Sequence, residues 1–133
     1  MLTPELRIQM FHNLKGYLLI TSNEELQIEA VRVLSNLSRH SDLCLEFVND
    51  KTFLEAICVV LEHTLRDLVF YTIGIVINIT VHEATRPKIL EKGIVSKLID
   101  VLKDSNIEDM ELSKVSAKAL HNIASDSNYW TFD

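Results

Sequence analysis

Glycine and proline are scarce in this chain of 133 residues, which has three of the first and two of the second. An all-β protein needs both residues in its many tight turns, so their scarcity disfavours that fold class. The net charge is -6 and basic residues form no run, so we expect no nucleic acid binding, which needs clustered cations. The longest apolar stretch, residues 68–81, is interrupted by polar residues and is too short to span a bilayer, so we expect no membrane insertion.

Cysteine is also rare, and Cys44 and Cys58 are too few for a disulfide scaffold. We interpret them as small buried hydrophobic residues in a reducing compartment. The N-terminus has no basic leader followed by an apolar stretch, so we expect no signal peptide and a cytoplasmic protein. The neighbours of Cys44, Leu43 and Leu45, argue for burial rather than for a reactive thiol.

Motifs of catalysis are missing as well. The sequence has no glycine-rich phosphate loop and no zinc-protease motif, and no set of metal ligands at suitable spacing. We therefore expect no catalytic residue, no metal site and no cofactor, and a protein that is not an enzyme.

What the sequence does contain is an internal repeat. Residues 25–38, 67–80 and 111–124 align on an asparagine, and the asparagines are 42 and then 44 residues apart. Apolar residues at offsets 0, 4, 7, 8 and 11 from a shared leucine lie on one stripe of a helix. An acidic residue precedes each leucine, where it complements the helix dipole. The aligned asparagines are Asn36, Asn78 and Asn122.

Further helices precede these segments. Residues 52–63 and 94–103 align at an offset of 41 as second helices, and residues 42–48 and 85–92 form short first helices. Gly93 should join the last of these pairs with a positive φ. The spacing therefore predicts about eight helices, three to each complete repeat.

The expected helix starts have recognisable sequence signals. Thr3 and Pro4 suit the cap and first position of a long helix that continues through residues 10–19. Thr85 is expected to cap the short helix that follows it.

A period near 42 with three helices per unit resembles the armadillo repeat. The resemblance lies in GIVSKLIDVL at 93–102, in ALHNIA at 119–124 and in VLSNLS at 33–38. HEAT repeats have a similar period but usually two helices and no such asparagine. The resemblance, to a divergent armadillo-repeat-containing protein, fragment or short isoform, implies an all-α, right-handed α-solenoid of three-helix repeats. It implies a single solenoid over residues 1–128, with a partial repeat at 3–38, repeats at 41–82 and 84–126, and an aromatic tail at 129–133.

The family resemblance also implies a function in protein–protein interaction. Third helices line a concave face in this family, and the asparagine clamps the backbone of a bound segment; a carboxamide both donates and accepts hydrogen bonds. We expect the three carboxamides to be free of internal partners; the alternative is that they bond to the solenoid's own backbone. The candidate partner-binding residues are Asn36, Asn78, Asn122, Arg32, Lys118, Tyr71 and Glu29.

One departure from the family narrows the expected partner. The nuclear-import subfamily has a tryptophan four residues before the asparagine, where this chain has Arg32, Gly74 and Lys118. No aromatic slots for lysine side chains are therefore expected, and Arg32 and Lys118 suit an acidic or polar protein or peptide.

Two alternatives stay open. The chain could instead be a structural subunit of a larger assembly that self-associates through uncapped repeat ends. The tail Tyr129-Trp130-Thr131-Phe132 could begin another repeat, pack over the last helices or anchor a partner. Because some divergent armadillo-repeat proteins serve cilia and flagella, a cilium or flagellum is the alternative location.

Overall fold

The computed structural model describes residues 1–19, 22–105 and 109–125, and these residues form helices joined by short turns, with no strand among them. The all-α prediction is confirmed. In chain order the elements are α1 (Pro4–Leu14), η1 (Lys15–Leu19), α2 (Glu24–Leu37), α3 (Ser41–Asn49), α4 (Lys51–Val60), α5 (Arg66–Thr80), η2 (Glu83–Thr85), α6 (Arg86–Glu91), α7 (Ile94–Asp104) and α8 (Met110–Ala124).

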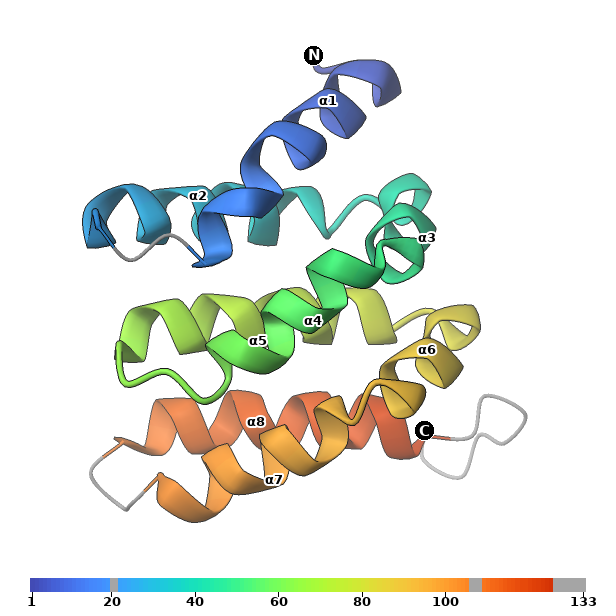
Figure 1. Ribbon diagram of the computed structural model, residues 1–133. Coiled ribbons are helices and arrows are strands. Elements are labelled where there is room, and N and C mark those ends of the chain that lie inside the picture. Colours follow the sequence, from blue (N-terminus) through green and yellow to red (C-terminus); the bar gives the residue numbers. More distant parts are fainter. Residues whose placement is uncertain (20–21, 106–108, 126–133) are drawn as a thin grey trace.

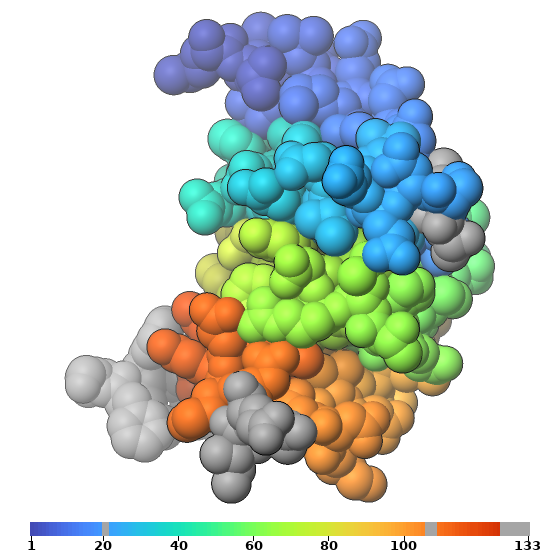
Figure 2. Space-filling model, turned by 90° about the vertical axis from the view of Figure 1, so that its left-hand side faces the viewer, coloured from blue at the N-terminus to red at the C-terminus, as the bar shows by residue number. Residues whose placement is uncertain are grey.

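The helices lie in three layers stacked along one axis (Figure 1). Each layer has a long third helix, α2, α5 or α8, with α1, α4 or α7 packed in front of it. The short helices α3 and α6 lie at one edge of the stack (Figure 1). Seen from the side, α2, α5 and α8 follow one another from top to bottom (Figure 2). The left-hand outline of the molecule is indented at the middle layer, between the blue N-terminal end and the orange-red C-terminal end. The arrangement is an α-solenoid.

The core is centred on α5, which packs against α2 on one side and α8 on the other. Nine of its fifteen residues are buried, compared with five of fourteen in α2 and three of fifteen in α8. A helix that is apolar nearly all round is expected to be covered on several sides, and the prediction that α5 is the most buried third helix is confirmed.

Among the described residues, no single helix is long and apolar enough to cross a membrane. Only α5 taken with the segment Glu83–Glu91 passes that test, as a pair bent by 116°.

Side-chain caps define where several helices begin. Thr3, Asn23, Asp50 and Asp109 each accept a hydrogen bond from the backbone N–H three residues later, which satisfies a donor that the helix leaves unpaired. Thr85 occupies the N-cap position of α6, but its side chain makes no capping hydrogen bond, so the prediction of a side-chain cap is wrong. Its hydroxyl instead donates back to two carbonyl oxygens, those of residues 79 and 82, because a 3-10 turn places it after the end of α5.

The junctions between first and second helices differ in the two complete repeats. Gly93 has φ of 77°, as predicted, a conformation that glycine adopts without a Cβ penalty. In the preceding repeat this place is filled by Asp50, which has φ of -90°. Asp50 is both the C-cap of α3 and the N-cap of α4.

The long first helix predicted through residue 19 is wrong in its second half. The α-helix ends at Leu14, and a 3-10 turn follows over Lys15–Leu19. This turn includes Gly16, which is a poor helix former. It buries Leu18 and leaves the carbonyl of Leu18 free to accept from the side chain of Gln27 in α2.

The burial of α5 yields a stability prediction. Ile75→Ala or Ile79→Ala, each at a side chain with no exposed surface, should lower the free energy of unfolding by about 2–5 kcal/mol through lost burial and the cavity left behind. Denaturant unfolding followed by circular dichroism measures the loss. Val81→Ala, next to the same helix but 60% exposed, is the control and should cost far less. Equal midpoints for all three variants would contradict this core.

Candidate partner-binding surfaces

The third helices present one continuous surface, which we call the ladder face and define by the outward residues of α2, α5 and α8. The predicted site residues all belong to it. In α2 and α8 the side chains of Glu29, Arg32, Asn36 and Lys118 are exposed. The remaining three, Tyr71, Asn78 and Asn122, are half-buried. The stripe predicted from helical periodicity therefore lies on the surface.

Two of the three asparagines bond to the solenoid itself. Asn78 donates through Nδ2 to the carbonyl oxygen of Ser35 at 3.2 Å and to the hydroxyl of Ser38 at 3.0 Å. Asn122 donates through Nδ2 to the carbonyl oxygen of Ile77 at 3.1 Å. Ser35 and Ile77 each come just before the asparagine of the preceding third helix, so the same bond recurs between successive layers.

The hypothesis that all three carboxamides lack internal partners is therefore wrong for Asn78 and Asn122. The layers lie close enough for each Nδ2 to reach the preceding third helix, where a backbone carbonyl oxygen accepts its hydrogen bond. Asn36 differs because no third helix precedes α2 among the described residues, and its side chain is exposed with no hydrogen bond to them.

The oxygen atoms of the same carboxamides have another role available. No donor from the described residues reaches Oδ1 of Asn78 or of Asn122. Neither oxygen belongs to the buried side-chain atoms that lack a hydrogen-bond partner, so both keep some access to solvent. The inward bonds of Nδ2 fix each side chain in place. Successive layers therefore present positioned acceptors in register.

An aromatic and ionic group lies beside Asn36 and Asn78. The guanidinium of Arg32 forms an ion pair with Oε1 of Glu29 at 2.8 Å, and its Cζ lies 5.7 Å from the centre of the Tyr71 ring. Next to it, Gly74 lets α5 approach α2 closely: a Cβ added there would lie 3.3 Å from Oγ of Ser35. Glycine at this position thus serves the close packing of α5 against α2.

A second surface, which the sequence did not reveal, is a cleft of about 540 Å³ between the last two layers. It lies between the turn joining α4 to α5 and the C-terminal half of α7. Its apolar part comes from Leu61, Val69, Val101 and Leu112. Such a volume is within the usual range, about 300–1,000 Å³, for binding pockets.

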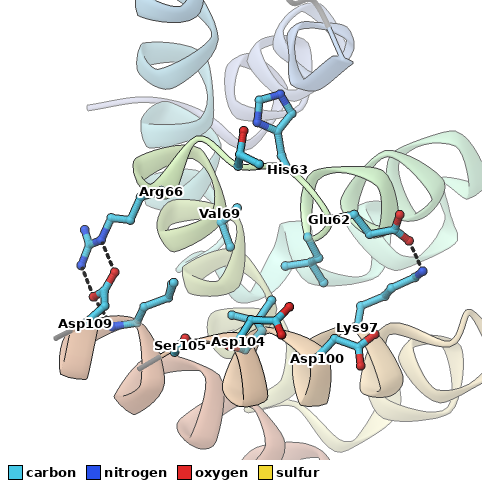
Figure 3. Close-up of a pocket in the computed structure, with 13 residues that line it drawn as sticks. Glu62, His63, Arg66, Val69, Lys97, Asp100, Asp104, Ser105 and Asp109 are labelled. Atoms are coloured by element: carbon cyan, nitrogen blue, oxygen red, sulfur yellow. Dashed lines mark hydrogen bonds and ion pairs between the residues drawn. The ribbon is translucent and has the colours of Figure 1, made fainter. Parts of the chain in front are cut away.

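Ion pairs form two walls of this cleft (Figure 3). On one side, Arg66 holds Asp109 through two bonds of 3.1 and 3.2 Å and Glu111 through a third of 2.7 Å. The hydrogen bonds to Asp109 and Glu111 raise the pKa of Arg66 further, and the bond from Arg66 lowers the pKa of Asp109. On the other side, Lys97 pairs with Glu62.

Two carboxylates without such partners lie between these walls. Asp100 and Asp104 project from α7 (Figure 3), and no cation of the described residues lies within 4.0 Å of either. Both side chains are exposed. A signal was present in the sequence, because two aspartates four residues apart near the end of a helix oppose one another and the helix dipole.

The remaining candidate chemistry is weak. Burial raises the pKa of the Cys44 thiol, and nearby Asp42 adds to the shift, so little thiolate exists at neutral pH. The described residues contain no group of three or more histidine, cysteine or acidic side chains placed to hold a metal ion. The aromatic tail, residues 129–133, lies outside the described residues.

Comparison with known proteins bears on the family. No family model matches the chain. Armadillo repeat-containing protein 2 from Mus musculus is 35% identical over 107 residues, and those of Bos taurus and Homo sapiens are 33% and 32% identical, each over 80% of this chain. The chain belongs to the armadillo-repeat family. It spans 12% of the length of these relatives.

A solved structure has a similar fold. The crystal structure of an engineered protein from the Northeast Structural Genomics Consortium superposes with a TM-score of 0.71 over 84% of this chain and 45% of that one. Its sequence identity is 23%, so it bears on the fold alone. The resemblance that the repeated asparagine indicated is confirmed.

The two kinds of asparagine in this armadillo chain predict different stability effects. Asn78→Ala should lower the free energy of unfolding by about 0.5–1.5 kcal/mol, because it removes an interlayer hydrogen bond. Asn36→Ala, at an exposed side chain without an internal bond, should change it by less than about 0.5 kcal/mol. Thermal melts of both variants and the parent make the comparison. A larger loss for Asn36→Ala than for Asn78→Ala would contradict the interlayer role.

Proposed function

We propose that this chain is a non-enzymatic interaction module whose ladder face binds a segment of a partner protein. The observation that carries the proposal is the recurrence of asparagines whose Nδ2 is held by the preceding layer while Oδ1 has no internal donor. An acceptor fixed in this way pairs with a backbone N–H of an extended partner without a further ordering cost for the asparagine.

The spacing of the layers favours an extended partner. Packed helices are separated by roughly 8–10 Å, and an extended chain advances about 3.3 Å per residue. One asparagine then meets a backbone N–H about every third partner residue. Asn36, Asn78 and Asn122 together match a segment of about seven residues.

Two exposed cations of the ladder face favour an acidic or polar segment, and the exposed carboxylates Glu25, Glu29, Asp67 and Glu111 on the same helices oppose that preference. Arg32 and Lys118 are exposed cations on α2 and α8, and Tyr71 lies between their layers. Glu29 pairs with Arg32 at 2.8 Å and partly offsets its charge. Attraction between exposed charges weakens with salt.

The relatives support the family of this module but not the identity of its partner or its location. They are armadillo-repeat-containing proteins of which this chain matches a small part. We propose the cytoplasm as the location, with a cilium or flagellum as the alternative. A fluorescent fusion imaged in ciliated cells distinguishes the two.

The ladder face is tested with a variant that leaves the core intact. After a partner has been captured with the immobilised chain and identified, its affinity is measured for the parent and for Arg32→Ala/Asn36→Ala/Lys118→Ala. Loss of the Asn36 bond alone, worth about 0.5–1.5 kcal/mol, weakens binding about two- to tenfold. The triple variant should weaken it more, with a smaller dependence on salt than the parent.

A matched control removes exposed cations elsewhere. Lys51→Ala/Lys88→Ala changes α4 and α6, outside the ladder face, and should leave affinity unchanged. If the control variant loses affinity and the ladder variant does not, the partner binds another surface and the proposal fails.

A second candidate function is stacking into a larger assembly through the repeat ends. The observation that favours it is an open apolar hollow of about 740 Å³ on α7 and α8, lined by Leu102, Met110 and Ala117 among others. Met110 is 70% exposed there. Exposed apolar surface of this kind drives association.

Stacking is tested by sedimentation velocity. The parent should shift to larger species as concentration rises, and Met110→Glu should remain monomeric under the same conditions. Lys103→Glu, at a neighbouring exposed position outside the lining, is the control. A parent that stays monomeric at every concentration overturns this second candidate and leaves the ladder face untouched.

A further inference from the structure

The cleft between the last two layers combines an apolar lining with an unbalanced charge. Its lining has four carboxylates, Glu62, Asp100, Asp104 and Asp109, and two cations, Arg66 and Lys97. Both cations already hold a carboxylate of the lining, since Arg66 bonds to Asp109 and Lys97 to Glu62. The negative charge left over is that of Asp100 and Asp104, which project from α7 between the two pairs (Figure 3).

These two carboxylates occupy an unfavourable place in the isolated chain. Asp104 is the last residue of α7, where the helix dipole disfavours an anion. Asp100 lies one turn earlier, at the spacing where like charges repel. No described cation lies within 4.0 Å of either, and Lys97, which attracts Asp100 from a greater distance, is paired with Glu62; a positive group arriving from outside would gain attraction without first breaking an ion pair.

The apolar part of the cleft sets the size and kind of that positive group. Leu61, Val69 and Val101 come from three different helices or their ends and line the same cleft as the two aspartates. A methylene stem with a terminal cation fits such a combination, because its apolar part lies on hydrophobic surface while its charge reaches the carboxylates. Bare inorganic cations make no use of the apolar lining.

We propose that this cleft receives an arginine or lysine side chain of a partner protein, with its stem against Leu61, Val69 and Val101 and its cation between Asp100 and Asp104. The guanidinium of arginine bonds two carboxylate oxygens at once, so arginine is the better occupant. The cleft shares none of the seven predicted partner-binding residues of the ladder face and has the opposite charge preference to Arg32 and Lys118. The inference therefore does not depend on the proposed function of that face.

The experiment uses a minimal probe on the whole chain. N-acetyl-arginine amide is titrated into labelled protein, and the backbone amide signals are followed by NMR. Signals of residues at the cleft, such as Val69, Asp100 and Asp104, should shift in a saturable way. N-acetyl-citrulline amide, which has nearly the same shape without the charge, should shift them much less. Equal shifts with both probes, or shifts spread over acidic positions elsewhere, overturn the proposal.

Matched variants separate the cleft from general charge. Asp100→Asn/Asp104→Asn should weaken binding of the arginine probe about tenfold, the effect of losing one or two charge-assisted hydrogen bonds. Asp100→Glu/Asp104→Glu retains both charges and should keep most of the affinity. Glu5→Gln/Glu91→Gln makes the same change in net charge on α1 and α6 and should have no effect.

Two results of these titrations reject the cleft as the arginine-binding site. Unchanged affinity in the asparagine variant, or an equal loss in the Glu5→Gln/Glu91→Gln control, rejects the cleft as the site. The dispersion of the same spectra reports whether a variant is folded, and the four substituted positions are exposed, so the substitutions do not disturb the core. Because the probe is a single amino-acid derivative, the result is separate from any result on the ladder face.

Discussion

The constraint on which this structure depends is that no layer can bury its own apolar surface. The central helix α5 is apolar nearly all round and is covered by α2 from one side and by α8 from the other. Removing either neighbour would expose side chains such as Ile73 and Ile75, each now fully buried, at a cost of about 25 cal/mol per Å² of apolar surface. Stability in such a stack is a sum over adjacent layers, so α5 links the two halves of the described chain.

Apolar burial brings the layers together, and polar contacts set their register. The bonds from Asn78 to Ser35 and from Asn122 to Ile77 join equivalent positions of successive third helices. Arg66 makes a similar link at the other end of these helices, from the start of α5 to Asp109, the residue that caps α8. Because the two links lie at opposite ends of the helices, they resist both sliding and rotation of one layer against the next.

Much of this fold was predictable from the sequence because its signals are local and repeated. The helical stripe around Ile75 and the position of Gly93 follow from periodicity and backbone sterics, and both predictions are confirmed. The break after Leu14 was missed because the apolar pattern continues through it; Gly16 weakens the helix locally, and the buried position of Leu18 favours the turn. The partners of Asn78 could not be predicted either. Whether an amide on a helix meets solvent or a neighbouring carbonyl depends on the distance between layers, which Gly74 helps to set and no local pattern reports.

The interlayer bonds of the asparagines also limit which partner groups the proposed ladder face could bind. A free carboxamide would pair with both the N–H and the C=O of an extended chain and so distinguish its two directions. In Asn78 both N–H donors of Nδ2 have partners in the preceding layer and only Oδ1 remains, whereas Asn122 uses one of its two N–H donors and keeps the other. Acceptors spaced along a face fix the distance between partner N–H groups, but they read neither sequence nor direction. On the proposed ladder face, discrimination between partners would then come mainly from the side chains beside the asparagines, which include the exposed cations Arg32 on α2 and Lys118 on α8. Under that proposal, a segment with acidic residues at the matching spacing would satisfy both cations in only one register, and the free carboxamide of Asn36 would add a preference for one chain direction.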